Sequence, residues 1–311
     1  MHYTGTIWRP PYEAGSLLLQ ATAGCTHHKC KFCTLYHELP FPFRMSPLEE
    51  IEDDLREAQM LLTSPLDRMA AALQGIHKET YPRRVFLVGG NPFVLQFERL
   101  KEIAQLIGRY FPQCQTIGCF ARITDIILKT DGELEWLRQL GYDAITIGVE
   151  TGDSQALDFM RKGYAPEDIL TQCRRLDQAG IRYHLFYLTG ISGAGRGREG
   201  ARATAQIFNQ LHPISIGTSM LTIYPESELY QEIQTGNWTE EGELEKLEEM
   251  EELVRRLTIP VCFAALGASN MIPFQGRLPQ DREALISDLQ SARGNLSEEQ
   301  LRHYRTHLPH L

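Results

Sequence analysis

The chain lacks the features of a membrane protein and of a disulfide-bonded secreted protein. Its 311 residues contain no apolar run of the roughly 18 residues that a transmembrane helix needs. Its seven cysteines are an odd number and are not spaced as a disulfide framework, which favours a reducing compartment. Residues 1–9 have no basic region followed by an apolar core, so no secretory signal is expected. We therefore expect a cytoplasmic protein without a membrane anchor.

An excess of positive charge is also missing. Lys and Arg total 31 against 40 Asp and Glu, which gives a formal net charge of −9. Extended nucleic-acid contacts need a basic footprint, so this balance argues against them. With 42% hydrophobic and 23% charged residues, the composition is that of a globular enzyme. A chain of this length is enough for one large α/β domain with a small appendage, and a small organic substrate is the favoured partner.

Three of the cysteines are clustered near the N-terminus. Cys25, Cys30 and Cys33 have the spacing C-x4-C-x2-C and follow a mostly apolar run. Such a cluster in an intracellular chain indicates a metal site. No fourth cysteine follows nearby, since the next one is Cys114. Three thiolates without a fourth suggest a cluster with one open metal position, where a reactive ligand binds.

Two other metal sites compete with this interpretation. Plant-type ferredoxins use the same spacing with a distant fourth cysteine, and structural zinc sites use four ligands. The long gap between Cys33 and Cys114 disfavours the ferredoxin cluster. His27 and His28 are the available zinc ligands, but both lie inside the tight loop between the first two cysteines. We expect them to be exposed or to donate hydrogen bonds near the site.

Short β-rich segments alternate with segments of helical periodicity. The expected strands are 17–22, 85–88, 116–120, 144–149, 183–188 and 215–223. The expected helices are 47–62, 97–110, 131–140, 167–180 and 197–211. Strands joined by helices pair in parallel with right-handed crossovers, and strands this apolar are covered by helices. The predicted fold is α/β, a partial (β/α)6 TIM-like barrel.

The pattern changes after about residue 224. Residues 240–257 carry eight acidic residues and predict a helix with a mostly solvated face. Residues 261–277 are apolar, and two short helices are expected in 279–311, the second opened by the capping sequence Ser297-Glu-Glu-Gln300. We expect an N-terminal arm (1–16), the barrel (17–235) and an α-rich C-terminal extension (236–311). The apolar segment must bury its surface, so we expect the extension to cap the open side of the barrel.

Glycines and polar residues follow most of the expected strands. The active site of a TIM-like barrel lies at the carboxyl ends of its strands. Paired glycines let a backbone approach a ligand closely, although a tight turn has the same requirement. A carboxylate after the fourth strand points toward the ligand space. The positions in question are Gly89, Gly90, Asn91, Glu150, Gly190 and Ile191.

These features together resemble the radical SAM superfamily over roughly residues 17–228. They are the three-cysteine loop, the aromatic Phe32 before its last cysteine, the Gly-Gly turn and a Gly-x-Glu strand end. The resemblance implies a [4Fe–4S] cluster on Cys25, Cys30 and Cys33, whose fourth iron binds the amino and carboxylate groups of S-adenosylmethionine (SAM). The commonest superfamily spacing is C-x3-C-x2-C, so this chain has one extra residue. It is most similar to a functionally unassigned branch with the run Leu-Gln-x-Thr-x-Gly-Cys-x-His-x-Lys-Cys-x-Phe-Cys.

The resemblance also implies residues around the methionine part of SAM. Gly89 and Gly90 match the turn whose backbone meets the amino group. Asn91 stands where many members have an acidic residue or threonine. Lys162 lies 12 residues after Glu150, where the coproporphyrinogen-dehydrogenase-like branch has an arginine that reaches the methionine carboxylate.

The adenosine part is assigned in the same way. Phe32 matches the aromatic residue beside the adenine, and Gly190 and Ile191 match the strand-five turn near it. Glu150 sits where related branches place a glutamine or glutamate near the ribose. On the C-terminal segment, the polar residues expected to contact substrate are Ser269, Asn270 and Arg277.

The implied activity is radical SAM chemistry. SAM would be cleaved reductively to a 5′-deoxyadenosyl radical that removes a hydrogen from a small-molecule substrate. A reductant such as flavodoxin or ferredoxin would supply the electron, with Lys29 and Lys31 attracting an acidic donor. The alternative is an iron–sulfur electron-transfer or sensor protein that does not use SAM, which would have no need of residues such as Glu150 and Lys162.

The remaining cysteines exclude some subclasses. No second cysteine cluster is present, so sulfur insertion and peptide maturation with auxiliary clusters are disfavoured. Only 24 residues precede Cys25, so no cobalamin-binding domain is expected before the barrel. The scattered cysteines are expected to be buried thiols; they are Cys114, Cys119, Cys173 and Cys262. No catalytic residue can be named from these patterns.

Overall fold

The computed structural model describes residues 1–64, 69, 73 and 81–308, which form two compact units. Unit 1 consists of Met1–His28, Leu35–Ile145 and Ala179–Ile181. Unit 2 consists of Lys29–Thr34, Thr146–Gln178 and Arg182–Leu311. The cysteine loop therefore begins in unit 1 with Cys25 and continues in unit 2 with Cys30 and Cys33.

Unit 1 is built on three parallel strands. Strand β4 pairs with β1 on one side and with β5 on the other, and its residues Val85 to Val88 are fully buried. A separate antiparallel pair, β2 and β3, flanks the cysteine loop. The bounds are β1 Leu17–Gln20, β2 Thr22–Gly24, β3 Phe43–Met45, β4 Arg84–Val88 and β5 Thr116–Ala121.

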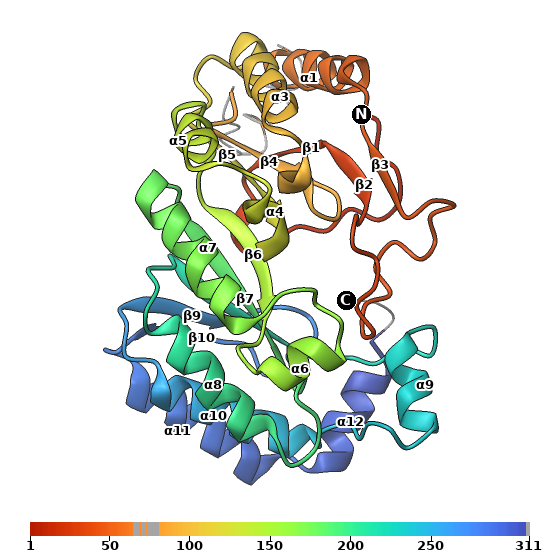
Figure 1. Ribbon diagram of the computed structural model, residues 1–311, viewed down its shortest axis with the longest axis vertical. Helices are drawn as coiled ribbons and strands as arrows, with labels where there is room; N and C mark the ends of the chain where they lie inside the picture. The colour runs from red at the N-terminus through yellow and green to blue at the C-terminus, as the bar shows by residue number, and fades with distance from the viewer. Residues whose placement is uncertain (65–68, 70–72, 74–80, 309–311) are drawn as a thin grey trace. The chain divides into compact units, whose positions relative to one another are not determined.

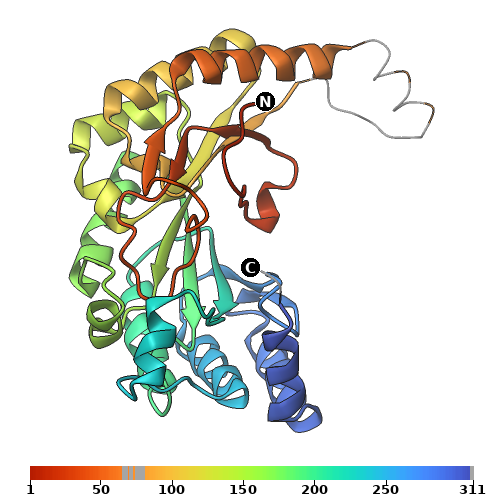
Figure 2. The ribbon, with the colours of Figure 1, turned by 90° about the vertical axis from the view of Figure 1, so that its right-hand side faces the viewer.

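The helices of unit 1 cover one side of these strands (Figure 2). In α3 the buried residues recur at helical spacing, as in Leu100, Ile103 and Ile107, so one apolar stripe faces the strands. Thr130 caps α5, because its hydroxyl accepts from the Glu133 backbone amide and the Glu133 carboxylate accepts from the Thr130 backbone amide. The bounds are α1 Leu48–Thr63, α3 Phe97–Tyr110, α4 Ile123–Ile127 and α5 Asp131–Gln139, with 3-10 turns at Pro11–Glu13 and Pro92–Val94.

The N-terminal arm is held against unit 1 by an ion pair. Arg84, the first residue of β4, donates two bonds from its guanidinium to the Glu13 carboxylate at 2.7 and 2.9 Å. It also donates to the carbonyl groups of Asp143 and Ala144, at 3.2 and 3.0 Å. Glu13 is buried, so this contact fixes the arm at the amino-terminal end of β4.

Unit 2 continues the α/β pattern with five strands in the order β6-β7-β8-β9-β10. Strands β7, β8 and β9 are parallel neighbours, and β10 runs antiparallel to β9. The bounds are β6 Ile145–Glu150, β7 Tyr183–Thr189, β8 Ser215–Met220, β9 Val261–Ala265 and β10 Phe274–Leu278.

The helices of unit 2 include three that lie side by side, α8, α10 and α11 (Figure 1). Helix α12 begins with the predicted capping box, because Ser297 accepts from the Gln300 amide. The bounds are α6 Ser154–Phe159, α7 Pro166–Ala179, α8 Gly197–Phe208, α9 Glu228–Gln234, α10 Glu243–Arg256, α11 Arg282–Asn295 and α12 Glu298–Thr306.

The fold-class prediction is confirmed, since parallel strands joined by helices make up both units. All six expected strands and five expected helices are present, most within two or three residues of the expected bounds. The apolar segment 261–277 differs from expectation, because it forms β9 and β10 and extends the sheet of unit 2. Its buried residues alternate with less buried ones, as in Val261, Phe263 and Ala265, which is the period of a strand. That the extension caps the barrel stays a prediction.

The acidic helix α10 is less solvated than the sequence predicts. Three of its glutamates and Glu241, which lies just before the helix, are buried, and the three on the helix have hydrogen-bond partners. For example, Glu243 accepts from Arg305 at 2.7 Å and Glu251 accepts from Arg293 at 2.9 Å. Such pairing offsets the cost of burying charge. The buried residues are Glu241, Glu243, Glu249 and Glu251.

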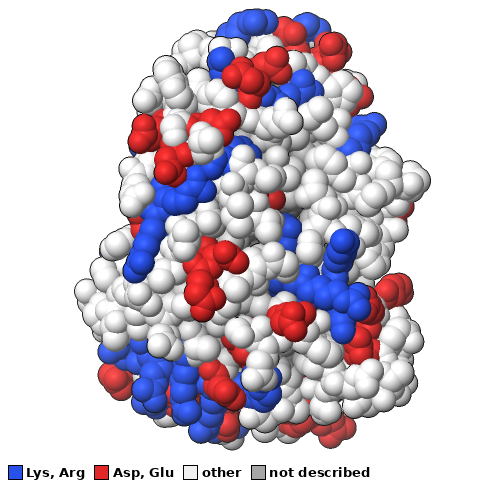
Figure 3. Space-filling model, in the orientation of Figure 1, with Lys and Arg blue, Asp and Glu red and all other residues white. Residues whose placement is uncertain are grey.

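Helix α10 also forms ion pairs with the neighbouring helix α8. Arg198 pairs with Glu248 and Arg202 with Glu252, both at 2.7 Å. Figure 3 shows Lys and Arg side chains interleaved with Asp and Glu in this part of the molecule. Interleaved charge is unlike the single-sign footprint of a nucleic-acid surface. Among the described residues, no helix is both long and apolar enough to cross a membrane.

Candidate cofactor site

The cysteine loop carries three thiols that form no disulfide bond. Cys25, Cys30 and Cys33 are all half-buried. A tight turn joins the last two, because the Cys33 amide donates to the Cys30 carbonyl at 3.1 Å. In the described part of the chain, no group of three His, Cys, Asp or Glu side chains is arranged to hold a single metal ion. Thiolates are the donors that iron–sulfur clusters require, so the donor chemistry fits a cluster.

Lys31, which lies between Cys30 and Cys33, makes side-chain and backbone contacts within unit 2. Its ammonium donates to Glu232 at 2.5 Å and lies 4.0 Å from the centre of the Phe159 ring. Its amide and carbonyl bond to Met160 and Leu229, at 3.3 and 2.8 Å. The expectation that Lys31 attracts an acidic electron donor is therefore wrong, because its charge is buried and paired. Lys29 is exposed.

The Gly89-Gly90 turn after β4 packs directly against β2. Gly89 has a φ of 118°, and a Cβ there would lie 2.0 Å from the Thr22 carbonyl oxygen. A Cβ on Gly90 would lie 2.1 Å from the Gly24 carbonyl oxygen. Glycine is thus required at both positions by the approach of the chain itself. The Thr22 hydroxyl beside this turn is buried and has no hydrogen-bond partner among the described residues, so a polar ligand group would fit there.

The side chain of Asn91 bonds to neighbouring residues of unit 1 through both its nitrogen and its oxygen. Its side-chain amide donates to the Thr26 hydroxyl at 2.9 Å and to the Asp125 carboxylate at 3.0 Å. Its side-chain oxygen accepts from the Thr26 amide at 3.2 Å. Asn91 is fully buried, so we infer that its bonds hold Thr26, the residue after Cys25, in place. Asp125, in the first turn of α4, also accepts from the Arg122 amide at 2.8 Å.

Asp125 should make the stability of the protein depend on pH. Burial raises the pKa of its carboxyl from 3.8 to about 6. Because the folded chain holds this proton more tightly, the contribution of Asp125 to the free energy of unfolding is full below pH 3.8 and is lost as pH rises through about 6. The difference is about 3 kcal/mol. Denaturant unfolding without added iron, at several pH values, should show this component in the wild type and not in Asp125→Asn; identical profiles would contradict it.

Glu150, the half-buried last residue of β6, pairs with buried Lys162. Glu150 has a left-handed backbone, with φ of 66°, which is uncommon outside glycine and frequent at functional sites. The Lys162 ammonium lies 3.1 Å from a Glu150 carboxylate oxygen and 3.4 Å from the Gly148 carbonyl oxygen. The rings of Phe32 and Tyr164 are each 5.7 Å from the same ammonium, within cation–π range.

Tyr164 is a residue that the sequence patterns did not reveal. Its hydroxyl donates to the carbonyl groups of Gly148 and Val149, at 3.1 and 2.9 Å. These contacts hold the end of β6 just before Glu150. Tyr164 lies two residues after Lys162 in the sequence, and this was the only signal that it is near the site. Such spacing alone does not predict a contact.

The turn after β7 lies over an apolar cluster. Gly190 has a φ of 90°, and Ile191 is fully buried. The cluster brings two predicted cofactor residues together, because it contains both Ile191 and Phe32. Its other members are Phe159, Met160, Leu188, Leu221, Ile223, Leu229 and Trp238.

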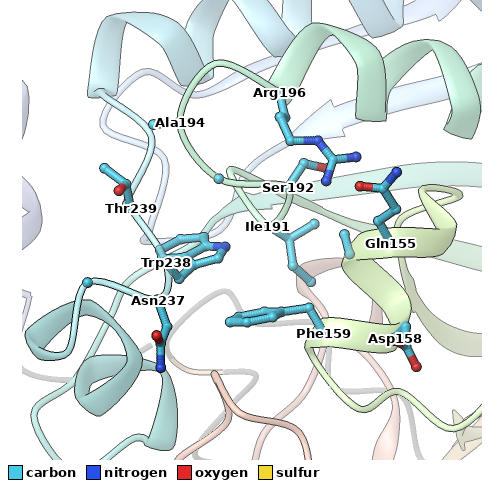
Figure 4. Close-up of a pocket in the computed structure, with 13 residues that line it drawn as sticks. Gln155, Asp158, Phe159, Ile191, Ser192, Ala194, Arg196, Asn237, Trp238 and Thr239 are labelled. Carbon is cyan, nitrogen blue, oxygen red and sulfur yellow. The ribbon is translucent and has the colours of Figure 1, made fainter.

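A cavity of about 520 Å³ adjoins this cluster (Figure 4). Its walls come from α6, from the loop between β7 and α8, and from the segment before α10. Phe159, Ile191 and Trp238 supply its apolar lining, while Arg196 lies at one side with its guanidinium 3.0 Å from Asp153. The volume and the mixed lining are typical of small-molecule sites.

The sequence of the chain matches the family model described as "Radical SAM superfamily" over residues 19–195. This match covers more than half of the chain. The chain belongs to the radical SAM superfamily. Radical SAM proteins use a [4Fe–4S] cluster and SAM, and these are the cofactors of this chain. No curated protein gives a significant match.

Solved structures of radical SAM enzymes share the fold. The methyltransferase TsrM from Kitasatospora setae, with cobalamin and a [4Fe–4S] cluster bound, gives a TM-score of 0.52 at 17% identity, covering 71% of this chain and 37% of that one. Coproporphyrinogen III oxidase from Escherichia coli gives a TM-score of 0.53 at 15% identity, covering 77% of this chain and 51% of that one. Methylornithine synthase gives a TM-score of 0.51 at 14% identity, covering 93% of this chain and 85% of that one. The chain thus spans less than two thirds of the first two, and these identities show the fold alone.

In this radical SAM chain, two of the predicted substrate residues, Ser269 and Asn270, lie in the loop between β9 and β10 and contact the carboxyl end of β8. The Ser269 hydroxyl accepts from the Met220 amide at 3.2 Å, and the Asn270 amide group donates to the Thr218 carbonyl at 2.9 Å. The side-chain oxygen of Asn270 is buried without a partner among the described residues, so it can accept from a ligand. The third predicted substrate residue, Arg277, is exposed on β10. The backbone of Ser269 is held by Arg305, which donates to the Ser269 carbonyl at 3.1 Å.

Proposed function

We propose that the chain is a radical SAM enzyme acting on a small-molecule substrate. The observation that carries this proposal is the assembly in unit 2, where Lys162 and Glu150 pair beside Phe32 at the carboxyl end of β6. When bound, the cluster and SAM supply reductive cleavage of the sulfonium, giving a 5′-deoxyadenosyl radical that removes a hydrogen atom from the substrate. The protein supplies position, a dry site and electrostatics.

Cys25, Cys30 and Cys33 are proposed to hold the cluster as thiolates. Three ligands from one short loop leave a fourth iron for the amino and carboxylate groups of SAM. The backbone of Gly89 and Gly90, with the unpartnered hydroxyl of Thr22, is proposed to meet the amino group. Asn91 contributes by fixing the loop through Thr26, because its own polar atoms are occupied.

Lys162 is proposed to bind the methionine carboxylate. It is 3% exposed, and a buried ammonium favours an anionic partner strongly. Glu150 holds Lys162 in place before the ligand arrives, and it offers its second carboxylate oxygen to a ribose hydroxyl. A site whose side chains are already ordered loses less entropy on binding. An electron carrier or sensor would have no use for this arrangement.

The adenine end of SAM is proposed to lie against Phe32 and Ile191. Both belong to one apolar cluster, and the cavity beside Ile191 gives a purine room between that cluster and the loops. Phe159 and Trp238 line this cavity, so they join the predicted residues as aromatic contacts. Ser269, Asn270 and Arg277 stay candidates for substrate contacts.

A low-potential reductant such as flavodoxin or ferredoxin is proposed to supply the electron. Exposed Lys29, next to Cys30, is the available cation on this loop for an acidic protein surface.

The proposed function predicts formation of 5′-deoxyadenosine. Anaerobically reconstituted protein, reduced with dithionite and given SAM, should release it even without substrate, as slow uncoupled cleavage. Protein that binds iron and SAM but releases none would contradict the proposal and favour a carrier or sensor.

A further inference from the structure

Beneath the turn at Gly190, helix α10 presents buried charged residues. Lys246 and Glu249 on α10, and Glu241 just before it, are all 0% exposed. Burying three ionisable side chains together is costly unless each has a defined partner. Their contacts point to the carboxyl ends of β7 and β8, because the Lys246 ammonium donates to the Leu221 carbonyl at 3.2 Å.

Glu249 makes two bonds with β7 and its turn. The Gly190 amide donates to one carboxylate oxygen at 2.7 Å, and the Tyr187 hydroxyl donates to the other. Burial raises the pKa of the Glu249 carboxyl, whereas the bonds from the Tyr187 hydroxyl and the Gly190 amide favour its ionised form. A bond to an ionised acceptor is about twice as strong as a neutral one. The turn also packs on α10, since a Cβ on Gly190 would lie 2.8 Å from the Lys246 side chain. Gly190 is therefore held from one side by a single carboxylate.

The carboxylate of Glu241 lies beside that of Glu249, against Gly197 at the start of α8. A Cβ on Gly197 would lie 1.8 Å from a Glu241 carboxylate oxygen and 3.0 Å from one of Glu249, so both carboxylates converge there. As an ionised group, Glu241 has no donor among the described residues. Burial and the nearby charge of Glu249 raise the pKa of Glu241 to about 11. A protonated Glu241 can donate to Glu249, which turns a repulsion into a hydrogen bond.

We propose that Glu249, supported by Glu241, is a positioning residue that fixes the Gly190-Ile191 turn for the adenosyl part of SAM. Glu249 does not touch the ligand; it acts through the Gly190 amide. The consequence for SAM rests on the proposed function, whereas the consequence for the turn does not. The two are therefore tested separately.

The first test uses the full chain without iron or SAM. Glu249→Asp keeps the charge and shortens the side chain by about 1.5 Å, which breaks a bond of 2.7 Å. Hydrogen exchange at Gly190 and Ile191 should then rise about tenfold or more. Glu252→Asp, on the same helix and paired with Arg202, is the matched control and should exchange like the wild type. Equal exchange in the two variants overturns the proposal.

The second test measures SAM affinity of anaerobically reconstituted protein. Glu249→Asp should bind SAM about tenfold more weakly than Glu252→Asp at equal iron content. Glu249→Gln keeps the length and an acceptor for the Gly190 amide, so it should stay within about threefold of the wild type. If Glu249 had a purely structural role, Glu249→Asp would lower the iron content and the thermal stability of the protein together with its SAM affinity.

The outcomes separate the two claims. If the wild type binds no SAM, the proposed function fails. If the wild type binds SAM and Glu249→Asp binds it equally well, only the positioning role is overturned. If Glu249→Asp does not fold, Tyr187→Phe is tested by the same two measurements, because it removes the hydroxyl bond to Glu249. Tyr187→Phe should then raise hydrogen exchange in the turn and weaken SAM binding. Unchanged exchange and unchanged SAM affinity in this variant overturn the proposal.

Discussion

Alanine at any one of Cys25, Cys30 or Cys33 is expected to abolish the iron–sulfur cluster. The wild type, reconstituted anaerobically, should contain about four iron atoms per chain and show a broad absorption near ~400 nm. Removing one of three thiolates leaves an iron without a protein ligand, so loss should be nearly complete. Iron and sulfide analysis with the visible spectrum measures it.

Two other cysteines serve as controls. Cys173 is fully buried, and burial raises the pKa of its thiol, so it stays a neutral thiol inside the core. Burial raises the pKa of Cys114 as well. Alanine at either position should leave the iron content unchanged. Two irons per chain in the wild type, or tight zinc without iron, would contradict the [4Fe–4S] assignment.

Replacing Lys162 with alanine is expected to weaken SAM binding about 30-fold while iron content stays intact. Charge-assisted hydrogen bonds to a carboxylate are each worth on the order of 2 kcal/mol, which corresponds to that factor. The variant also leaves Glu150 without the partner at 3.1 Å, so its charge would repel the ligand carboxylate. SAM titration of the reconstituted protein measures the loss.

Arg161 offers a matched control for Lys162. It is the preceding residue and also basic, but it is exposed and pairs with Glu228 at 2.8 Å. Arg161→Ala should bind SAM like the wild type. Lys162→Ala with unchanged affinity would remove Lys162 from the site, and equal losses in both variants would indicate a general effect of charge.

Sequence patterns predicted the regular elements well because these depend on local periodicity. Helix 97–110 was expected with the bounds that α3 has, and strand 183–188 was expected one residue shorter than β7. The hairpin of β9 and β10 was missed because an apolar segment was interpreted by its composition, although its alternating pattern favours strands.

The partners of site residues were not predictable, because they come from distant parts of the chain. Lys31 looked exposed beside the cysteines, yet its ammonium is bound by Glu232, 201 positions away. Glu249 looked like part of a solvated acidic face, yet it binds the Gly190 amide, 59 positions away. No local pattern encodes such contacts. The resemblance to a known family predicts that Glu150 and Lys162 both serve the SAM site, but not that they pair with each other.

The central claim, reductive cleavage of SAM by a cluster on the three-cysteine loop, is tested most directly by quantifying 5′-deoxyadenosine. Wild type and Cys30→Ala would be reconstituted anaerobically, reduced with dithionite and incubated with SAM. The wild type should form 5′-deoxyadenosine in amounts that depend on reductant, and Cys30→Ala should form none. Equal formation by both proteins, or none by wild type with a full cluster and bound SAM, would contradict the claim.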